Sequence, residues 1–318
     1  MSIAFVFPGQ GSQSVGMQGA LAAAHPVVTE VYAEGSAVLG YDLWQLVAQG
    51  PVELLNATER TQPAMLAAGV ASWRLWRQLG GPVPAIVSGH SLGEFTALVC
   101  AEAIEFKTAI QLVQVRGQLM QSAVPVGTGS MAAVLGMEDA ELEAICAEAA
   151  QGQVVEAVNY NSPGQVVIAG HAAAVERAIA LAKARGAKRA VTLPVSVPSH
   201  SSLMRGAAEQ LRERLDAVEL RRPRLQYLSA VDAALHADPS DIRATLVRQL
   251  ASPVRWSATV LALTAAGAGT LIECGPGKVL TGLNRRIERR PEISCLALED
   301  ATSIQLALQA VQAGGTHA

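Results

Sequence analysis

The stretch from Pro84 to Cys100 reads PAIVSGHSLGEFTALVC and constrains the fold more than any other part of the chain. The apolar run Ala85–Val87 predicts a buried strand, and the residues after Gly93 predict a helix. Between them, residues 89–93 have the pattern G-x-S-x-G, which in a strand–turn–helix context is typical of a nucleophile elbow. Glycine on either side of Ser91 removes the Cβ atoms that would clash in so sharp a turn.

The elbow predicts that Ser91 presents its hydroxyl at the tip of the turn. The N-terminus of the following helix offers free N–H groups and the positive end of the helix dipole, and both suit a developing negative charge. The alternative is a serine in an ordinary strand-to-helix loop, because the bare pattern also occurs by chance.

The composition favours a well-buried α/β protein. The chain has 318 residues, which is enough for one large domain with a smaller one inserted into it. Half of the residues are hydrophobic but only 4% are aromatic, so the apolar content is mostly Ala, Val and Leu. The formal net charge of −3 gives no electrostatic reason to expect a nucleic-acid partner.

The cysteines and the lengths of the apolar runs indicate in which cellular compartment the protein is located. Cys100, Cys146, Cys274 and Cys295 are scattered and form no C-x-x-C pair, which argues for a reducing compartment and against disulfides or a metal site. No apolar run approaches the roughly 20 residues that a membrane helix needs, and residues 1–7 lack the basic region of a signal peptide. We therefore expect a cytoplasmic protein that makes no membrane contact.

The first half of the chain alternates strand and helix patterns. Ile3–Phe7 predicts a core strand, and a glycine-rich loop, Pro8–Gln13, follows it where ligand sites of α/β sheets gather. Helical patterns follow at residues 26–39 and 62–79. The helix predicted at residues 107–122 is largely apolar but contains Arg116, and a buried guanidinium there would need an anion. A surface arginine is the alternative, and the sequence leaves the choice open.

Residues 128–195 predict a compact unit of their own. Strands are expected at residues 130–135, 154–159, 166–169 and 188–193, helices at 138–150 and 172–185, and a turn at Tyr160–Gly164. The order β-α-β-β-α-β is the ferredoxin-like arrangement. We therefore expect a small α+β subdomain inserted into a core formed by residues 1–127 and 196–318.

The remaining chain again alternates strands and helices. Strands are expected at residues 225–231, 270–274 and 294–298, and helices at 203–215, 240–250, 257–265, 278–290 and 302–312. Alternation on both sides of the insertion predicts a mostly parallel sheet that is covered on both faces. The helix at residues 278–290 carries Arg285, Arg286, Arg289 and Arg290. It is either a docking surface for an acidic partner or a solvated helix face.

A serine nucleophile needs a base at neutral pH, and six histidines are available. Five of them are less suitable. His25 lies at a turn, His90 lies beside the serine but across the elbow, and His171 follows a strand of the small unit. His236 follows an acidic loop, and His317 lies in the tail. His200, in the stiff segment Pro194–His200, is favoured by elimination, and a structural histidine is the alternative. Spacing identifies no triad acid, because many Asp and Glu residues are available.

Seven motifs in order along the chain resemble the malonyl-CoA:acyl carrier protein transacylases. They are VFPGQGSQ at 6–13, TQPA at 61–64, GHSLGEF at 89–95, VRGQLMQ at 115–121, NYNSPGQ at 159–165, PVSVPSH at 194–200 and ECGPGKVL at 273–280. The resemblance extends from residue 3 to about residue 300. One departure is Glu102, where the family usually has a glycine after the elbow helix. This position touches no catalytic residue but affects local helix packing.

The resemblance implies an α/β-hydrolase-like core with an inserted ferredoxin-like subdomain. In this family Ser91 would be the nucleophile and His200 the base, oriented by the backbone carbonyl of Gln249 rather than by an acid. The backbone N–H groups of Gln10 and Leu92 would form the oxyanion hole.

The resemblance further implies that Arg116 would bind the free carboxylate of a malonyl group. The expected reaction moves malonyl from malonyl-CoA to the phosphopantetheine thiol of holo acyl carrier protein, through a malonyl-serine, to supply fatty acid synthesis. It needs no cofactor. The alternatives are a malonyltransferase of polyketide synthesis or malonate decarboxylation, a serine thioesterase or esterase, and a non-catalytic binder of the carrier protein.

Overall fold

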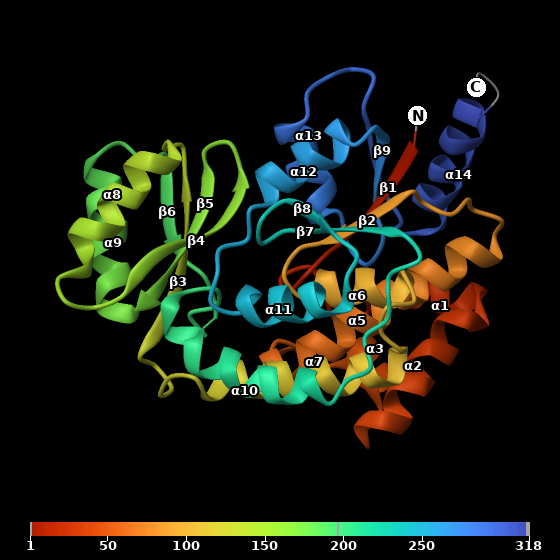
Figure 1. Ribbon diagram of the computed structural model, residues 1–318, viewed down its shortest axis with the longest axis horizontal. Helices are drawn as coiled ribbons and strands as arrows, with labels where there is room; N and C mark the ends of the chain where they lie inside the picture. The colour runs from red at the N-terminus through yellow and green to blue at the C-terminus, as the bar shows by residue number, and fades with distance from the viewer. Residues whose placement is uncertain (1, 196, 316–318) are drawn as a thin grey trace.

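A six-stranded sheet forms the centre of the molecule in the computed structural model, which describes residues 2–195 and 197–315 (Figure 1). The strand order is β10-β9-β1-β2-β7-β8. All neighbours pair in parallel except β7 and β8. The strands are β1 (Ser2–Phe7), β2 (Ile86–Gly89), β7 (Gln226–Ser229), β8 (Ala234–His236), β9 (Ala268–Glu273) and β10 (Ser294–Ala297). The predicted α/β fold with a mostly parallel sheet is confirmed.

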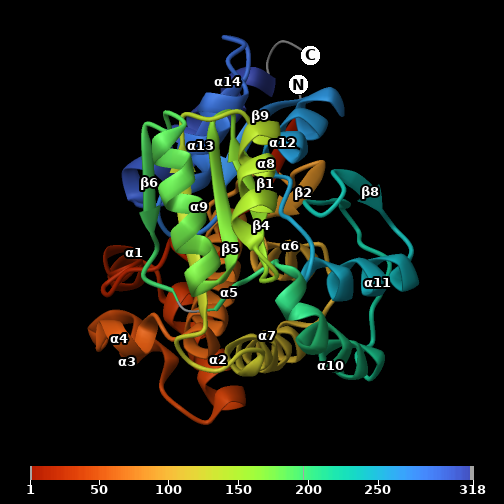
Figure 2. The same ribbon diagram turned by 90° about the vertical axis from the view of Figure 1, so that its left-hand side faces the viewer.

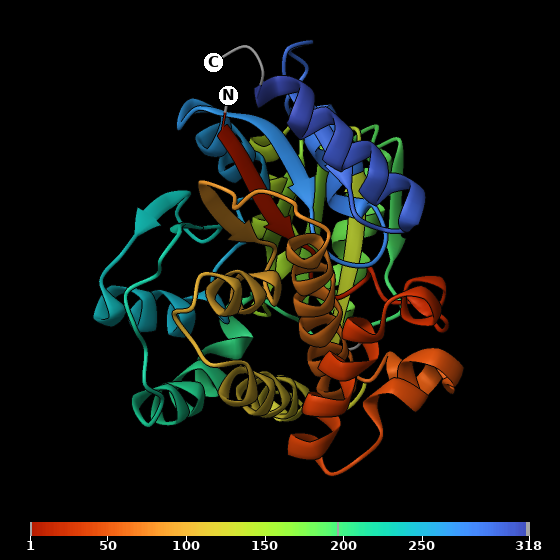
Figure 3. The ribbon, with the colours of Figure 1, turned by 90° about the vertical axis from the view of Figure 1, so that its right-hand side faces the viewer.

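Helices cover both faces of this sheet because alternate residues of each strand point to opposite sides. Phe5 of β1 packs edge-on against Trp73 and Trp76 on one side, while Val6 faces a separate apolar cluster on the other. Figure 3 shows β1, the red strand, with helices on either side of it. The helices outside the second sheet are α1 (Gly19–Ala24), α2 (Pro26–Leu39), α3 (Leu43–Gln49), α4 (Val52–Leu55), α5 (Thr58–Gln78), α6 (Gly93–Cys100), α7 (Phe106–Ser122), α10 (Arg205–Asp216), α11 (Pro239–Gln249), α12 (Trp256–Ala265), α13 (Val279–Ile287) and α14 (Ala301–Gly315), with the short 3₁₀ helix η1 (Ser202–Met204).

A second, antiparallel sheet lies to one side with the order β4-β5-β3-β6. Its strands and helices follow one another as β3 (Gly129–Leu135), α8 (Asp139–Ala150), β4 (Val155–Ser162), β5 (Gln165–His171), α9 (Ala172–Ala184) and β6 (Arg189–Thr192). Helices α8 and α9 lie in front of the sheet in Figure 2. The apolar cluster between these helices and the sheet is made only of residues from this part of the chain. The order β-α-β-β-α-β is the predicted one.

Strand β4 also joins the two parts of the molecule. The N–H of Tyr160 donates to the carbonyl of Val254 at 2.9 Å, and the N–H of Val254 donates to the carbonyl of Val158 at 2.9 Å. This parallel bridge attaches the small sheet to the segment between α11 and α12.

Three features differ from the sequence prediction. The predicted turn at Tyr160–Gly164 is wrong, because β4 continues to Ser162 and only Pro163 and Gly164 make the turn, with Gly164 at φ 70°. Helix α5 starts at Thr58 rather than at residue 62, so Pro63 lies inside the helix, where its missing N–H leaves out one backbone hydrogen bond. The helix predicted through residue 290 ends at Ile287. Pro291 follows Arg290 and disfavours a helical conformation there.

The predictions also omitted α3, α4 and β8. The predicted return of the chain to the core at residue 196 lies outside the described residues. None of the helices in the described part of the chain combines the length and the hydropathy that crossing a membrane requires.

The carboxyl ends of the central strands meet at one edge of the large sheet. Phe7 of β1 is in register with Gly89 of β2, and Val6 is in register with Glu273 of β9. The loops that follow these strands therefore lie together, at the edge where α/β sheets bind ligands.

Candidate active site

The elbow has the geometry that its sequence predicts. Ser91 lies between β2 and α6 with φ 52°, in the left-handed region. A Cβ on Gly89 would lie 1.9 Å from the carbonyl carbon of Gly93, and a Cβ on Gly93 would lie 1.9 Å from the carbonyl oxygen of Phe7. Neither position therefore accepts a side chain, and both glycines are needed for the serine to take this conformation.

His200 lies against Ser91, although the two are far apart in the sequence. Its Nε2 is 2.8 Å from Ser91 Oγ, and its Nδ1 is 2.9 Å from the backbone oxygen of Gln249. Because a carbonyl oxygen only accepts, Nδ1 carries the hydrogen and Nε2 is free to accept the serine proton. His200 also has a left-handed backbone, with φ 66°. The structure thus brings together Ser91, His200 and the Gln249 carbonyl.

The imidazole of His200 is neutral at physiological pH. The residue is only 4% exposed. Burial, and then the positive charge of Arg116, lower the pKa of His200 to about 3. A neutral imidazole is the form that can take a proton from a hydroxyl.

Arg116 is buried beside the serine, which settles the choice that the sequence left open. It is 1% exposed, and its Nη2 donates to Ser91 Oγ at 3.0 Å and to Gln249 Oε1 at 3.0 Å. Its Nη1 donates to Gln62 Oε1 at 2.8 Å, while Nε has no hydrogen-bond partner in the described part of the chain. Burial lowers the pKa of Arg116 to about 10, so the side chain stays charged at neutral pH.

The two predicted oxyanion-hole residues, Gln10 and Leu92, line the same cavity as Ser91. Gln10 lies in the loop after β1, and Leu92 lies in the elbow. A Cβ on Gly9 would lie 2.5 Å from the carbonyl oxygen of His90, so the two loops are in close contact. The backbone N–H groups of Gln10 and Leu92 donate no hydrogen bond within residues 2–195 and 197–315.

A cavity of about 390 Å³ surrounds these groups. One wall comes from the core and the other from the small sheet and the segment that leaves it. The side chains from the second wall are mostly apolar and include Met131, Asn159, Leu193, Pro194, Val195 and Val197. A ligand in this cavity would have the polar groups around Ser91 on one side and an apolar surface on the other.

His90 contacts the small sheet rather than the serine. Its Nε2 lies 2.9 Å from Asn161 Oδ1 on β4, and its ring lies 5.6 Å from the Trp256 ring. Since an amide oxygen only accepts, Nε2 of His90 carries the hydrogen. The bond ties the elbow to the small sheet across the cavity.

Sequence reasoning assigned no role to two residues that contact the site. Gln62 holds Arg116, and Glu94, buried on α6, accepts a hydrogen bond from Gln249 Nε2 at 3.0 Å. Both lie in motifs that the sequence analysis quotes. The available signal was a polar residue within an otherwise apolar helical run, and this signal does not identify the partner.

The basic segment after β9 is not one exposed helix face. Arg285 donates to the carbonyl of Cys295 at 2.8 Å, and Arg286 donates to Gln165 Oε1 at 3.0 Å. Arg290 lies beyond the helix and pairs with Glu288 at 2.6 Å. These contacts inside the molecule occupy part of the predicted docking surface.

Residues 4–312 match a family described as the acyl transferase domain. The malonyl CoA-acyl carrier protein transacylase of Escherichia coli (strain K12) is 54% identical over 96% of this chain and 98% of that protein. The namesake of Bacillus subtilis (strain 168) is 42% identical over 98% of this chain and 97% of that protein.

Solved structures are similar over the same range. An acyl carrier protein S-malonyltransferase from Vibrio cholerae is 55% identical with a TM-score of 0.93, covering 96% of this chain and 100% of that one. A malonyl-transacylase solved in complex with its type II PKS acyl-carrier protein is 53% identical with a TM-score of 0.95, covering 98% of this chain and 100% of that one.

Proposed function

This chain belongs to the acyl transferase domain family, and from that membership we propose that it transfers a malonyl group from malonyl-CoA to acyl carrier protein in fatty acid synthesis. It is an acyl-carrier-protein S-malonyltransferase. The observation that carries the malonyl specificity is the buried Arg116 guanidinium, whose Nη2 lies 3.0 Å from Ser91 Oγ and whose Nε is unpaired in the described part of the chain. Arg116 forms no salt bridge with a described residue, although the charge of Glu94 raises its pKa, and a carboxylate on the acyl group supplies a direct ion-pair partner.

In the first half-reaction Ser91 Oγ attacks the thioester carbonyl carbon while its proton passes to His200 Nε2. The backbone N–H groups of Gln10 and Leu92 hold the negative oxygen of the tetrahedral intermediate. Collapse breaks the carbon–sulfur bond, and the departing CoA thiolate takes the proton from Nε2. The product is a malonyl ester of Ser91.

The second half-reaction reverses these steps with a different thiol. The phosphopantetheine thiol of the carrier gives its proton to His200 Nε2 and attacks the ester carbon. The Ser91 oxygen leaves and recovers the proton. One thioester replaces another, so no electrons are gained or lost and the proposed reaction uses no cofactor.

Substrate binding changes the basicity of His200 in this mechanism. The charge of Arg116 is the second cause of the low pKa of His200. A malonyl carboxylate paired with Arg116 offsets that charge and makes the imidazole a stronger base when the substrate is in place.

We also propose that residues 1–127 with 196–318 form the catalytic core and that residues 128–195 form the small subdomain. The separate apolar core of the second sheet supports this division. A cytoplasmic location is proposed as well, and the four cysteines, all buried free thiols, are compatible with a reducing compartment.

Intact-protein mass spectrometry tests the function. Brief mixing with malonyl-CoA should give one malonyl adduct, which is absent in Ser91→Ala and moves to added holo carrier protein. An adduct that decays to free malonate at the same rate with or without carrier would instead indicate a hydrolase. No adduct at all would contradict the proposal.

Arg116→Ala tests the malonyl specificity. We expect the rate of malonyl transfer to fall at least about tenfold more than that of acetyl transfer, because a hydrogen bond to a charged group contributes about 1.5–3 kcal/mol. The rates of Ser91 acylation by malonyl-CoA and acetyl-CoA measure this. Equal losses for both substrates would remove the assigned role of Arg116.

A malonyltransferase of polyketide synthesis is the second candidate. The relative that was solved with a type II PKS acyl-carrier protein is 53% identical to this chain, which is close to the identity with the curated transacylases. Transfer rates to the fatty acid carrier and to a polyketide carrier of the same organism decide between the two pathways.

A further inference from the structure

Glu94 is a buried carboxylate that the proposed mechanism does not use. It lies in the first turn of α6, three residues after Ser91, and is fully buried. It does not line the catalytic cavity. A buried carboxylate is costly unless donors surround it, so its partners indicate what it does.

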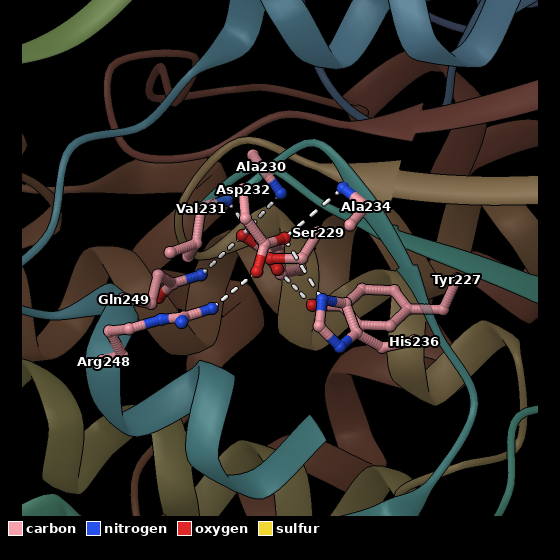
Figure 4. A network of polar contacts seen from close by, with 10 residues as sticks. Tyr227, Ser229, Ala230, Val231, Asp232, Ala234, His236, Arg248 and Gln249 are labelled. Atoms are coloured by element: carbon pink, nitrogen blue, oxygen red, sulfur yellow. Dashed lines mark hydrogen bonds and ion pairs between the residues drawn. The ribbon is translucent and has the colours of Figure 1, made fainter. Parts of the chain in front are cut away.

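Donors from Tyr227, Ala230 and Gln249 converge on Glu94, and a hydrogen bond from Ser229 also lowers its pKa. The Tyr227 hydroxyl donates to Oε2, and Oε1 accepts from the N–H of Ala230 at 3.2 Å and from Gln249 Nε2 at 3.0 Å. Figure 4 shows Tyr227 on β7, Ala230 just after it and Gln249 at the end of α11 pointing toward the same place. Glu94 therefore connects the elbow helix with two segments that border the site.

These contacts determine which way the Gln249 amide faces. Its Nε2 donates to Glu94 Oε1 and to the carbonyl of Ser91 at 3.0 Å, and its Oε1 accepts from Arg116 at 3.0 Å. A reversed amide would place its oxygen against two acceptors and its NH₂ group against a guanidinium, which only donates. The buried acceptors on one side thus keep the amide oxygen turned toward Arg116.

We propose that Glu94 is a positioning residue that orients the Gln249 side-chain amide toward Arg116 and so contributes to the preference for carboxylated acyl groups. The proposal rests on the malonyl transfer proposed above. Glu94 touches neither substrate nor Ser91 Oγ, and it acts through Gln249. It affects the guanidinium more than the base, because His200 is held by the backbone oxygen of Gln249 and not by the amide.

The hydrogen bond between Glu94 and Gln249 does not depend on the charge of Glu94, although that charge separately raises the pKa of Arg116. Burial raises the pKa of Glu94, and the hydrogen bonds from Tyr227 and Gln249 oppose this effect. In either protonation state Oε1 accepts from Gln249, since a proton on the carboxyl group would reside on Oε2. A glutamine at this position keeps the acceptor, whereas a methionine of similar length removes it.

The first test compares Glu94→Met with Glu94→Gln. The readout is the ratio of kcat/KM for Ser91 acylation by malonyl-CoA to that by acetyl-CoA. We expect Glu94→Met to lower this ratio about tenfold or more and Glu94→Gln to keep it within about threefold of the wild-type ratio. An unchanged ratio in Glu94→Met, or equal losses in both variants, would overturn the proposal.

Gln249→Met provides a second route if Glu94→Met does not fold. This substitution removes the amide but leaves the backbone oxygen and the other donors to Glu94 in place. It should lower the malonyl-to-acetyl ratio about as much as Glu94→Met, and the double variant should lose little more, because both changes remove the same interaction. The proposal would be contradicted if Gln249→Met kept the malonyl-to-acetyl ratio of the wild type. It would also be contradicted if the reductions of this ratio were additive in the double variant.

Glu273→Met is the matched control. Glu273 is also fully buried and accepts from the N–H of Leu280 at 3.1 Å and from Thr281 N–H and Oγ1 at 2.7 and 2.8 Å. Replacing the Glu273 carboxylate should lower the thermal stability of the protein without changing the malonyl-to-acetyl ratio of kcat/KM. If wild-type protein forms no malonyl-Ser91, the proposed function fails. If wild type and Arg116→Ala behave as expected but Glu94→Met keeps the wild-type ratio, only this inference fails.

Discussion

The imidazole of His200 is buried next to a permanently charged guanidinium. Burial and the charge of Arg116 both disfavour the imidazolium form, and they bring the pKa of His200 to about 3. The bond from Nδ1 to the Gln249 carbonyl opposes them but is weaker. His200 is therefore held in the form that accepts a proton, and no carboxylate partner is needed to select the tautomer.

This low pKa predicts a flat pH profile. A base acts in its neutral form, which is present above its pKa, so kcat/KM for Ser91 acylation should stay constant from about pH 8 down to about pH 5. In Arg116→Ala one cause of the low pKa is absent, and the acidic limb should move to higher pH. Rapid-quench measurement of the malonyl-enzyme across this range checks both statements.

A wild-type acidic limb near pH 6.5, the ordinary value for histidine, would contradict the prediction. An unchanged limb in Arg116→Ala would show that the guanidinium does not affect His200.

The sequence predicted some contacts of the candidate site and missed others. The contact between Ser91 and His200 is the one expected from the elbow and from the elimination of the other histidines. Glu94 and Gln62 were missed because a polar residue in a buried helix can pair with many others. The partner of Glu94, Gln249, is distant in the sequence, and only the fold brings the end of α11 within hydrogen-bond distance of Glu94 on α6.

At the scale of elements, helix α6 ends in a Schellman motif that normally requires glycine. The N–H of Ala103 donates to the carbonyl of Leu98 at 2.8 Å, and the N–H of Glu102 donates to the carbonyl of Val99 at 3.0 Å. Glu102 has φ 59°. The family resemblance predicts a glycine here, and the left-handed backbone explains why.

We expect Glu102→Gly to stabilise the protein by up to about 1 kcal/mol, because relief of the left-handed strain exceeds the added flexibility of the unfolded chain. The ion pair of Glu102 with Arg224 at 3.1 Å is exposed and contributes little. Urea unfolding of both proteins measures the difference.

Glu102→Ala is the control for this substitution. It removes the same ion pair but keeps a Cβ, so it should not stabilise. A gain of equal size in both variants would point to the charge instead of the backbone.

Long periodic helices and apolar strands were predictable at this scale, and α2 has the predicted bounds. The short helices α3 and α4 were not predicted, because one or two turns give little periodicity. The overlong basic helix shows the opposite error. Its pattern continued to residue 290, but Pro291 and the pairing of Arg290 with Glu288 favour an extended end.

At the scale of the whole molecule, the small sheet contributes to the position of His200. Glu156 on β4 accepts from the N–H and the Oγ–H of Ser202, both at 2.7 Å. Ser202 begins η1, two residues after His200. Together with the bond between His90 and Asn161 and the bridge at Val254, this contact fixes the two parts of the molecule around the cavity.

Glu156→Ala should lower kcat for malonyl and acetyl transfer together, by roughly tenfold or more, because it releases the segment that carries His200. The malonyl-to-acetyl ratio should stay unchanged, since Arg116 is not affected. Steady-state kinetics with both substrates provide the measurement.

Glu143→Ala is the matched control, because Glu143 lies in the same part of the chain and bonds only to Tyr160 on β4 among the described residues. It should leave kcat unchanged. A shift in the malonyl-to-acetyl ratio of Glu156→Ala would mean that Glu156 acts on the acyl pocket and not on the His200 segment.

The order of the small unit was predictable, but its attachment to the core was not. The alternation of helix and strand patterns indicated β-α-β-β-α-β without any knowledge of neighbours. The contacts that attach it, such as Glu156 to Ser202, join residues whose separation along the chain carries no pattern. Only the folded backbone shows that they meet.

The left-handed backbone at Ser91 and His200 has an evolutionary consequence. Glycine would occupy both positions with less strain than the residues present, by about 1–2 kcal/mol each. Selection for heat resistance alone would therefore favour glycine at the two positions where we propose the nucleophile and the base. The hydroxyl and the imidazole at these positions are traits that selection for turnover has to maintain against selection for durability.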